Sequence, residues 1–310
     1  MEYLGFAERA VLRTGRGIET ALACNFAAAS VLAGLLACGE CQAVVPQEFA
    51  PGIVSTGHEF GITFMPDGKE AYFSRIAAKQ PIHIYRTRFV NGAWQEPEKL
   101  SLSSDDWSDL DPFVSPDGKQ LFFISTRPDA GKTSGIDKRD MDIWVATRSA
   151  VEWIAPHRLE NVNSEGKEGS PSVARNGTLY FFSDRQAGTG KNAVYESRFV
   201  KEHYEPATLL PAAINAGPSD TSPFIAPNGK TLLFYSTREG GFGKADLYMS
   251  HKKHGKWTAS VNLGPVVNSA DSDYNPAVSP DGLQLFFGRN SRLYMIPTKT
   301  VPGLGSKRFR

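Results

Sequence analysis

Short apolar runs alternate with polar turns along most of the chain, and this alternation recurs in five copies. Each copy has an Asp-Gly or Asn-Gly pair and then, after a few residues, a continuous apolar run such as LFFI at 121–124. The Asp-Gly or Asn-Gly pair provides the positive φ angles of a tight hairpin, and the apolar run is typical of a strand buried on both faces. The turn glycines are Gly68, Gly118, Gly177, Gly229 and Gly282. Each copy therefore predicts a hairpin whose second strand lies inside the protein.

Two further strands follow each predicted hairpin. The third ends near an aromatic residue, as in DIW at 142–144, and the fourth carries an aromatic residue with a leucine six positions later, such as Trp153 and Leu159. Four such aromatic–leucine pairs occur, and none follows Tyr294. Residues 44–49 (VVPQEF) instead stand where a fourth strand would precede the first copy.

Tandem copies of four short strands, at a period of about 50 residues, are typical of a β-propeller. We predict an all-β fold, a five-bladed propeller over residues 44–297, in which the N-terminal strand joins the last three strands and closes the ring. Closure removes exposed sheet edges. Six blades are the alternative, but the 13 residues after Pro297 are too few for four more strands of about 5 residues each.

Charged residues recur at two places in each copy. A carboxylate stands nine residues before each turn glycine: Glu59, Asp109, Glu168, Asp220 and Asp273. An arginine stands just after each second strand: Arg75, Arg127, Arg185, Arg238 and Arg289.

The carboxylates are predicted to begin the innermost strands and so to ring one mouth of the central channel. At about 10 Å separation and an effective dielectric near 20, each like-charged pair would cost roughly 1.7 kcal/mol, so cationic partners are expected. We predict acid–arginine pairs between adjacent blades. The alternative is an acidic channel mouth that binds a cationic peptide or a cation, with calcium as the candidate.

Composition excludes several classes of function. Lys+Arg is 34 and Asp+Glu is 33 among 310 residues, so no charge excess indicates nucleic acid or a membrane surface as partner. All three cysteines precede the repeats, and neither G-x-S-x-G nor H-E-x-x-H occurs, so nucleophilic catalysis and zinc are not indicated. We predict a monomer with no catalytic residues, no resident metal and no cofactor, calcium being the one alternative.

Two segments flank the repeats. Residues 1–43 hold a mostly apolar run, FAAASVLAGLLA at 26–37, which is too short to span a bilayer comfortably but fits a signal-peptide core. LLAC at 35–38 resembles a bacterial lipobox, so Cys38 is a candidate lipidation site; cleavage near residue 43 without lipidation is the alternative. Residues 298–310 form a short tail that is expected to fray. Its basic residues near the end are Lys307, Arg308 and Arg310.

The repeat itself resembles a known family. PFVSPDGKQLFFISTR at 112–127 is similar to the WD40-like propeller repeat of TolB-like proteins. GGFGKADLY at 240–248 and NLGPVVNS at 262–269 resemble the version in envelope proteins that combine such repeats with OmpA-like domains. The resemblance covers about residues 58–297. It implies an exported propeller in the periplasm or cell envelope that binds a protein or envelope component without catalysis and touches the membrane only through a lipid anchor.

A second function stays open from the residues alone: a carbohydrate-active enzyme or glycan-binding module that uses the acidic channel mouth. Glycosidases place two carboxyl groups about 5–10 Å apart in distinct environments. An enzyme should therefore have one or two channel acids without an arginine partner beside an open pocket, whereas a scaffold should have every acid paired.

Overall fold

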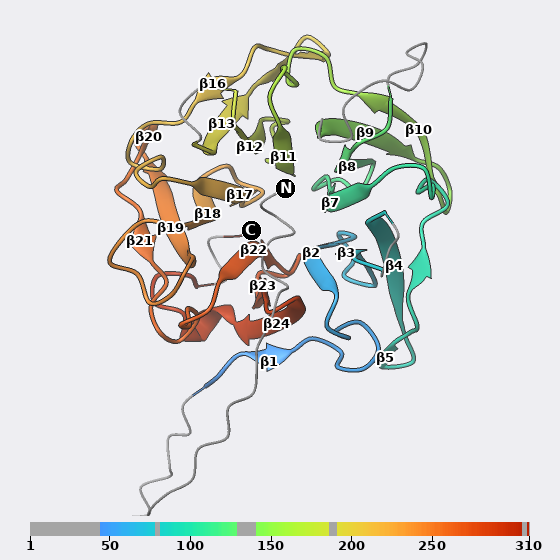
Figure 1. Cartoon of the computed structure of the whole chain (residues 1–310), viewed down its shortest axis with the longest axis horizontal. Helices are drawn as coiled ribbons and strands as arrows, with labels where there is room; N and C mark the ends of the chain where they lie inside the picture. Colours follow the sequence, from blue (N-terminus) through green and yellow to red (C-terminus); the bar gives the residue numbers. More distant parts are fainter. Residues whose placement is uncertain (1–43, 78–80, 129–140, 186–190, 306–308, 310) are drawn as a thin grey trace, which may run out of the picture. The chain divides into compact units, whose positions relative to one another are not determined.

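The computed structural model describes residues 44–77, 81–128, 141–185, 191–305 and 309. The predicted leader at 1–43, with Cys38, lies outside the described residues. The rest is an all-β protein in which five sheets surround a common axis (Figure 1). The prediction of a five-bladed propeller is therefore confirmed. Within the described ranges, no helix is long and apolar enough to cross a bilayer.

The blades follow one another along the chain. Blade 1 contains β2 (Glu59–Phe64), β3 (Glu70–Arg75), β4 (His83–Val90) and β6 (Glu98–Lys99), with β5 (Ala93–Trp94) extending its outer hairpin. Blade 2 contains β7 (Asp109–Val114), β8 (Gln120–Ser125), β9 (Asp142–Arg148) and β10 (Trp153–Arg158). Blade 3 contains β11 (Glu168–Val173), β12 (Leu179–Ser183), β13 (Ala193–Ser197) and β16 (Thr208–Leu209), with a two-stranded ribbon of β14 (Phe199–Val200) and β15 (His203–Tyr204).

The last two blades complete the ring. Blade 4 contains β17 (Asp220–Ile225), β18 (Thr231–Ser236), β19 (Asp246–Lys253) and β21 (Val261–Asn262), with β20 (Lys256–Trp257) extending it. Blade 5 contains β22 (Asp273–Val278), β23 (Gln284–Arg289), β24 (Arg292–Pro297) and β1 (Gln47–Glu48). A short 3-10 helix, η2 (Thr298–Thr300), follows. In every blade the first strand in this order, β2, β7, β11, β17 or β22, lies nearest the axis (Figure 1).

The N-terminal strand closes the ring, as predicted. β1 pairs antiparallel with β24, with Gln47 opposite Met295. Phe49 follows β1, is 4% exposed, and packs edge-on against Trp94 and Phe286 with ring centroids 5.3 and 5.2 Å apart. Because Phe286 belongs to blade 5 and Trp94 to blade 1, the contacts of Phe49 join the first and last blades of the propeller.

The apolar runs bury both faces of each second strand, as their sequence predicts. Leu121, Phe122 and Phe123 on β8 are 0% exposed. Phe122 packs in one cluster with residues of blade 3 such as Phe181 and Tyr204. The core thus lies between adjacent blades, since each sheet covers the face of the next.

Each innermost strand has a bulge at its third residue, and this bulge positions the axial side chains. The third residues have positive φ angles of 57°, 49°, 47°, 47° and 48°: Gly61, Asp111, Ser170, Ser222 and Asn275. Proline follows this position in blades 2 to 5 and isoleucine follows it in blade 1. Proline fits here because it lacks an N–H and the ladder is already interrupted at a bulge.

The C-terminal segment packs against the ring. Val301, Leu304 and Phe309 are 2%, 0% and 3% exposed and belong to the core cluster of blades 4 and 5. The Thr298 hydroxyl donates to the Gly282 carbonyl at 2.8 Å. The expectation that this tail frays is therefore wrong for its described residues, because its apolar side chains are buried.

Candidate functional site

The five recurring acids begin the innermost strands, and all are 0–1% exposed. The structure brings each of them together with the arginine expected from the sequence. The N–O distances are 2.9 Å for Arg75–Glu59, 2.7 Å for Arg127–Asp109, 3.0 Å for Arg185–Glu168, 2.6 Å for Arg238–Asp220 and 2.7 Å for Arg289–Asp273. Since these carboxylates are fully buried, they do not form the open, cation-binding channel mouth that was the alternative to acid–arginine pairs.

The ion pairs lie within blades, which corrects the expectation that they join adjacent blades. The acid begins the first strand and the arginine ends or follows the second strand of the same sheet, as with Asp273 opposite Arg289. The guanidinium also reaches the connection from the preceding blade, because Arg289 Nη2 donates to the Val267 carbonyl at 2.6 Å. Arg185 makes the equivalent bond to Val162 at 2.6 Å. Each arginine therefore fastens an inter-blade connection to the blade that follows it.

Aromatic rings of the second and third strands cover the same arginines. The Arg238 guanidinium carbon lies 5.4 Å from the centroid of Phe234 and 4.4 Å from that of Tyr248. Such cation–π contacts add to the ion pair when water is excluded. The recurring aromatic residues of the third strand thus pack against the recurring arginines.

Burial and hydrogen bonding shift the pKa of four paired acids in different directions, although these acids share one position in the repeat. Burial raises the pKa of Asp109, against the attraction of Arg127, and likewise raises the pKa of Glu168 and Asp273. Burial acts on Glu59 too, yet the pKa of Glu59 is lowered, because the Thr56 hydroxyl and backbone N–H groups that include that of His58 donate to its carboxylate. Hydrogen bonds to the charged form therefore outweigh burial at Glu59 and do not outweigh it at Asp109, Glu168 and Asp273.

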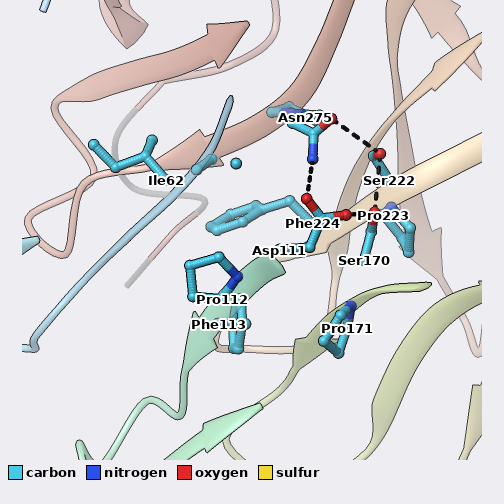
Figure 2. A pocket seen from close by; sticks show the side chains of 13 residues that line it. Ile62, Asp111, Pro112, Phe113, Ser170, Pro171, Ser222, Pro223, Phe224 and Asn275 are labelled. Carbon is cyan, nitrogen blue, oxygen red and sulfur yellow. Dashed lines mark hydrogen bonds between the residues drawn. The ribbon is translucent and has the colours of Figure 1, made fainter. Parts of the chain in front are cut away.

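A second ring lies two residues further along the same strands, at the axis of the propeller. Figure 2 shows Asp111, Ser170, Ser222 and Asn275 pointing toward one another. Ser170 Oγ donates to Asp111 Oδ2 at 2.6 Å, and Asn275 Nδ2 donates to Asp111 Oδ1 at 3.1 Å. Ser170 and Ser222 hydroxyls are 3.1 Å apart, and Ser222 Oγ donates to Asn275 Oδ1 at 3.4 Å. Each hydroxyl has a single hydrogen, so Ser170 and Ser222 can donate in only two of these three hydroxyl contacts at a time. Side chains of four blades thus meet in a closed circle of polar contacts.

Gly61 is the fifth member of this axial ring and leaves the circle room to close. A Cβ atom at Gly61 would lie 2.9 Å from Asp111 Oδ1 and 3.3 Å from Asn275 Nδ2. A side chain there would displace the amide–carboxylate contact. Blade 1 therefore contributes backbone alone at the axis.

Asp111 is the chemically unusual member of the axial ring. Burial raises its pKa to about 6, although the bonds from Ser170 and Asn275 favour the charged form. Within the described part of the chain its carboxylate has no cationic partner. The recurring charged positions do not include Asp111; aligning the repeats on the recurring acid and taking the second residue after it would have found the whole axial ring.

The channel at the axial ring is narrow. The cavity there is about 40 Å³, which is room for about one water molecule and not for a substrate. Among the described residues, no three histidine, cysteine, aspartate or glutamate side chains gather closely enough to hold a metal ion. What the axial ring can do is join blades through polar contacts and hold one proton at a buried carboxyl.

Comparison with known proteins was made by sequence and by structure. A scan against protein-family models finds no match. A search of curated protein sequences finds no match either. Solved structures give many matches, in which identity to this chain is low.

Structures similar to this chain include the putative TolB from Agrobacterium tumefaciens, with a TM-score of 0.49, 16% identity, and coverage of 74% of this chain and 69% of that chain. TolB from Acinetobacter baumannii gives a TM-score of 0.48 and 16% identity over 77% of this chain and 54% of that chain. The GH43 endo-arabinanase from Bacillus licheniformis gives a TM-score of 0.48 and 10% identity over 79% of this chain and 94% of that chain. TolB proteins and a hydrolase thus stand side by side among the structural neighbours, and they assign no activity to this chain.

Proposed function

We propose that this chain is a non-catalytic, exported β-propeller that acts as a protein-interaction or envelope scaffold. One observation carries the proposal: each of the five acids that could face the channel is buried and paired with an arginine. A glycosidase needs two carboxyl groups that reach the substrate from distinct environments. The arrangement of the acids favours architecture over acid–base chemistry.

The axial ring supports the same proposal. Asp111 has a raised pKa, which is a property of many catalytic acids. It is, however, 4% exposed and lies beside a space of about 40 Å³, so a sugar ring cannot reach it. Its hydrogen bonds to Ser170 and Asn275 use both carboxylate oxygens.

Export is the part of the proposal that rests on sequence. The apolar run at 26–37 and the lipobox-like LLAC at 35–38 favour a periplasmic or envelope location with Cys38 as anchor. Intact-mass measurement of membrane-extracted protein tests the anchor, since acylation would leave Cys38 as a lipid-modified N-terminus. An unmodified N-terminus after residue 43 would contradict it.

Photo-crosslinking in the native envelope tests the scaffold role. Phe242, 49% exposed, lies between β18 and β19 at the end of the blade where the acids lie, and Leu283, 48% exposed, lies in the turn between β22 and β23 at the opposite end. A photoreactive phenylalanine at each position should give a discrete protein adduct from one face and not from the other. The proposal would be overturned in favour of the carbohydrate-active alternative if neither position gave a protein adduct and the purified protein released sugars from envelope polysaccharides.

A further inference from the structure

The channel widens at the end opposite the ion pairs. A second cavity of about 340 Å³ begins where the axial ring stops, and the two spaces share Phe113, Phe224 and Ala277. Figure 2 shows Phe113 and Phe224 beside the axial ring. The mouth is formed by the far ends of the innermost strands and by the hairpin turns that follow them. It is therefore a feature of the ring as a whole and not of one blade.

The lining of this cavity is mostly apolar and aromatic, with Thr63, Ser115 and Arg175 as its polar residues. Its prolines come from the hairpin turns of four blades: Pro66, Pro116, Pro227 and Pro280. Its aromatic rings are Phe64, Phe113, Phe224 and Phe309. Phe309 is supplied by the C-terminal segment, is 3% exposed, and its ring centroid lies 6.4 Å from that of Phe224. The cavity exists with Phe309 in place, so this ring forms one of its walls.

One charged residue lines the cavity among the described residues, and it is a cation. Arg175, in the turn after β11, is exposed at the rim. Its guanidinium has no acidic partner in the part of the chain that the structure describes, and no described acid lines the cavity. Arg175 differs in this respect from the five recurring arginines, each of which forms an ion pair with a buried carboxylate.

Size and charge together define a ligand class. An apolar cavity of about 150 Å³ holds one benzene ring, and ligand pockets typically measure about 300–1,000 Å³. The 340 Å³ of this cavity is thus enough for about two rings. We propose that the channel mouth binds an amphipathic aromatic acid, with its rings between the phenylalanines and its anionic group at Arg175. A guanidinium at the edge of an apolar site favours carboxylate or sulfonate through charge-assisted hydrogen bonds.

Two fluorescent probes of similar shape test this inference on the purified chain. One is 8-anilino-1-naphthalenesulfonate, and the other is N-phenyl-1-naphthylamine, which lacks the sulfonate. We expect saturable binding of both. Arg175→Gln should lower the affinity for the sulfonate probe by about tenfold and leave the affinity for the neutral probe unchanged. Arg198→Gln is the matched control, because Arg198 lies on another part of blade 3 and its side chain is 69% exposed.

The wall residue gives the second readout. Phe309→Ala should lower the affinity for both probes severalfold, since it removes one aromatic contact and opens the cavity to water. Phe242→Ala, which truncates an exposed phenylalanine elsewhere, should change neither. The assignment would be overturned if Arg175→Gln lowered the affinity for both probes equally, or if Phe309→Ala changed the affinity for neither. A concentration-dependent dimer on size-exclusion chromatography that excludes both probes would also overturn it, since a second copy would then occupy the mouth.

Discussion

The five innermost strands carry two sets of residues only two positions apart, and these sets differ in chemistry. At the first position every blade has a carboxylate that is buried and paired with an arginine of its own sheet. At the third position the blades carry glycine, aspartate, serine, serine and asparagine in one shared left-handed backbone conformation. The first set repeats because each blade needs the same contact with its own arginine. The second set varies because its side chains meet at the axis and must complement one another.

This comparison separates two kinds of information in a repeat protein. In this chain, a residue that is the same in every copy makes a contact that is repeated in every blade. A residue that differs at one shared position makes a contact that occurs once in the molecule. Five identical carboxylates at the axis would repel one another without partners, whereas one aspartate, two hydroxyls and one amide satisfy one another.

Breaking one ion pair should have the largest effect. Arg127 and Asp109 are 8% and 0% exposed in their side chains, so Arg127→Met leaves a buried carboxylate without its cation. We expect a loss of about 3–5 kcal/mol in the free energy of unfolding, or roughly 10 °C in melting temperature. Arg198→Met is the control, since Arg198 and Glu205 form an exposed pair with side chains 69% and 33% exposed, and it should cost less than about 1 kcal/mol. Equal effects in the two variants would contradict a structural role for the recurring pairs.

Neutralising the axial carboxylate should stabilise the protein, and only above acidic pH. The pKa of Asp111 is raised from 3.8 to about 6, so the folded state holds a proton that the unfolded state releases between these values. Stability from this group is therefore highest below about pH 4, falls as the pH rises to about 6, and stays low above that. With each pKa unit worth 1.36 kcal/mol, Asp111→Asn should gain up to about 3 kcal/mol at pH 8.

Denaturant titration at pH 4 and pH 8 measures the difference between wild type and Asp111→Asn. Comparing the two proteins at each pH cancels the contribution of the paired acids, which titrate in both. A variant that is less stable than wild type by the same amount at both pH values would show that hydrogen-bond geometry, and not buried charge, governs this position.

The fold could be predicted from the sequence because its determinants are local or recur. Asp117 and Gly118 specify a hairpin by their own backbone preferences, and the missing fourth strand after Tyr294 predicted closure by residues 44–49. The ion-pair partners also followed from recurrence. The burial of Glu59 and its equivalents did not follow, because it depends on how the preceding connection folds over the carboxylate.

The axial ring and the cavity at the channel mouth were beyond sequence reasoning for a different reason. The contact between Asp111 and Asn275 joins residues 164 positions apart, and no local pattern relates them. Phe309 belongs to a short terminal segment that was expected to fray, yet its ring is buried at the mouth. Both features depend on which residues the closed ring brings to the axis.

Adding a side chain at Gly61, the axial residue without one, should have an intermediate effect on the free energy of unfolding. Gly61 has φ +57°, and a Cβ there would lie 2.9 Å from Asp111 Oδ1. Gly61→Ala should cost about 1–2 kcal/mol from the left-handed backbone alone, and more if the contact between Asp111 and Asn275 is displaced. Gly68→Ala is the control, because Gly68 has φ +70° and a Cβ on it would meet nothing within 4 Å. A Gly61→Ala cost no greater than that of Gly68→Ala, by thermal melting, would mean that the ring tolerates a fifth side chain.

The smallest effect is expected where two changes oppose each other at one position. Ser222 has φ +47° and links Ser170 to Asn275 through its hydroxyl. Ser222→Ala removes these bonds and keeps the backbone strain, so it should cost about 1–2 kcal/mol. Ser222→Gly removes the same bonds but relieves the left-handed conformation, so its net cost should be below about 1 kcal/mol. The difference between the two variants in chemical denaturation measures the strain that the axial position imposes on every blade except the first. If glycine proves no better than alanine here, the shared positive φ is not strained, and the variable residues of the axial ring were selected for their side chains alone.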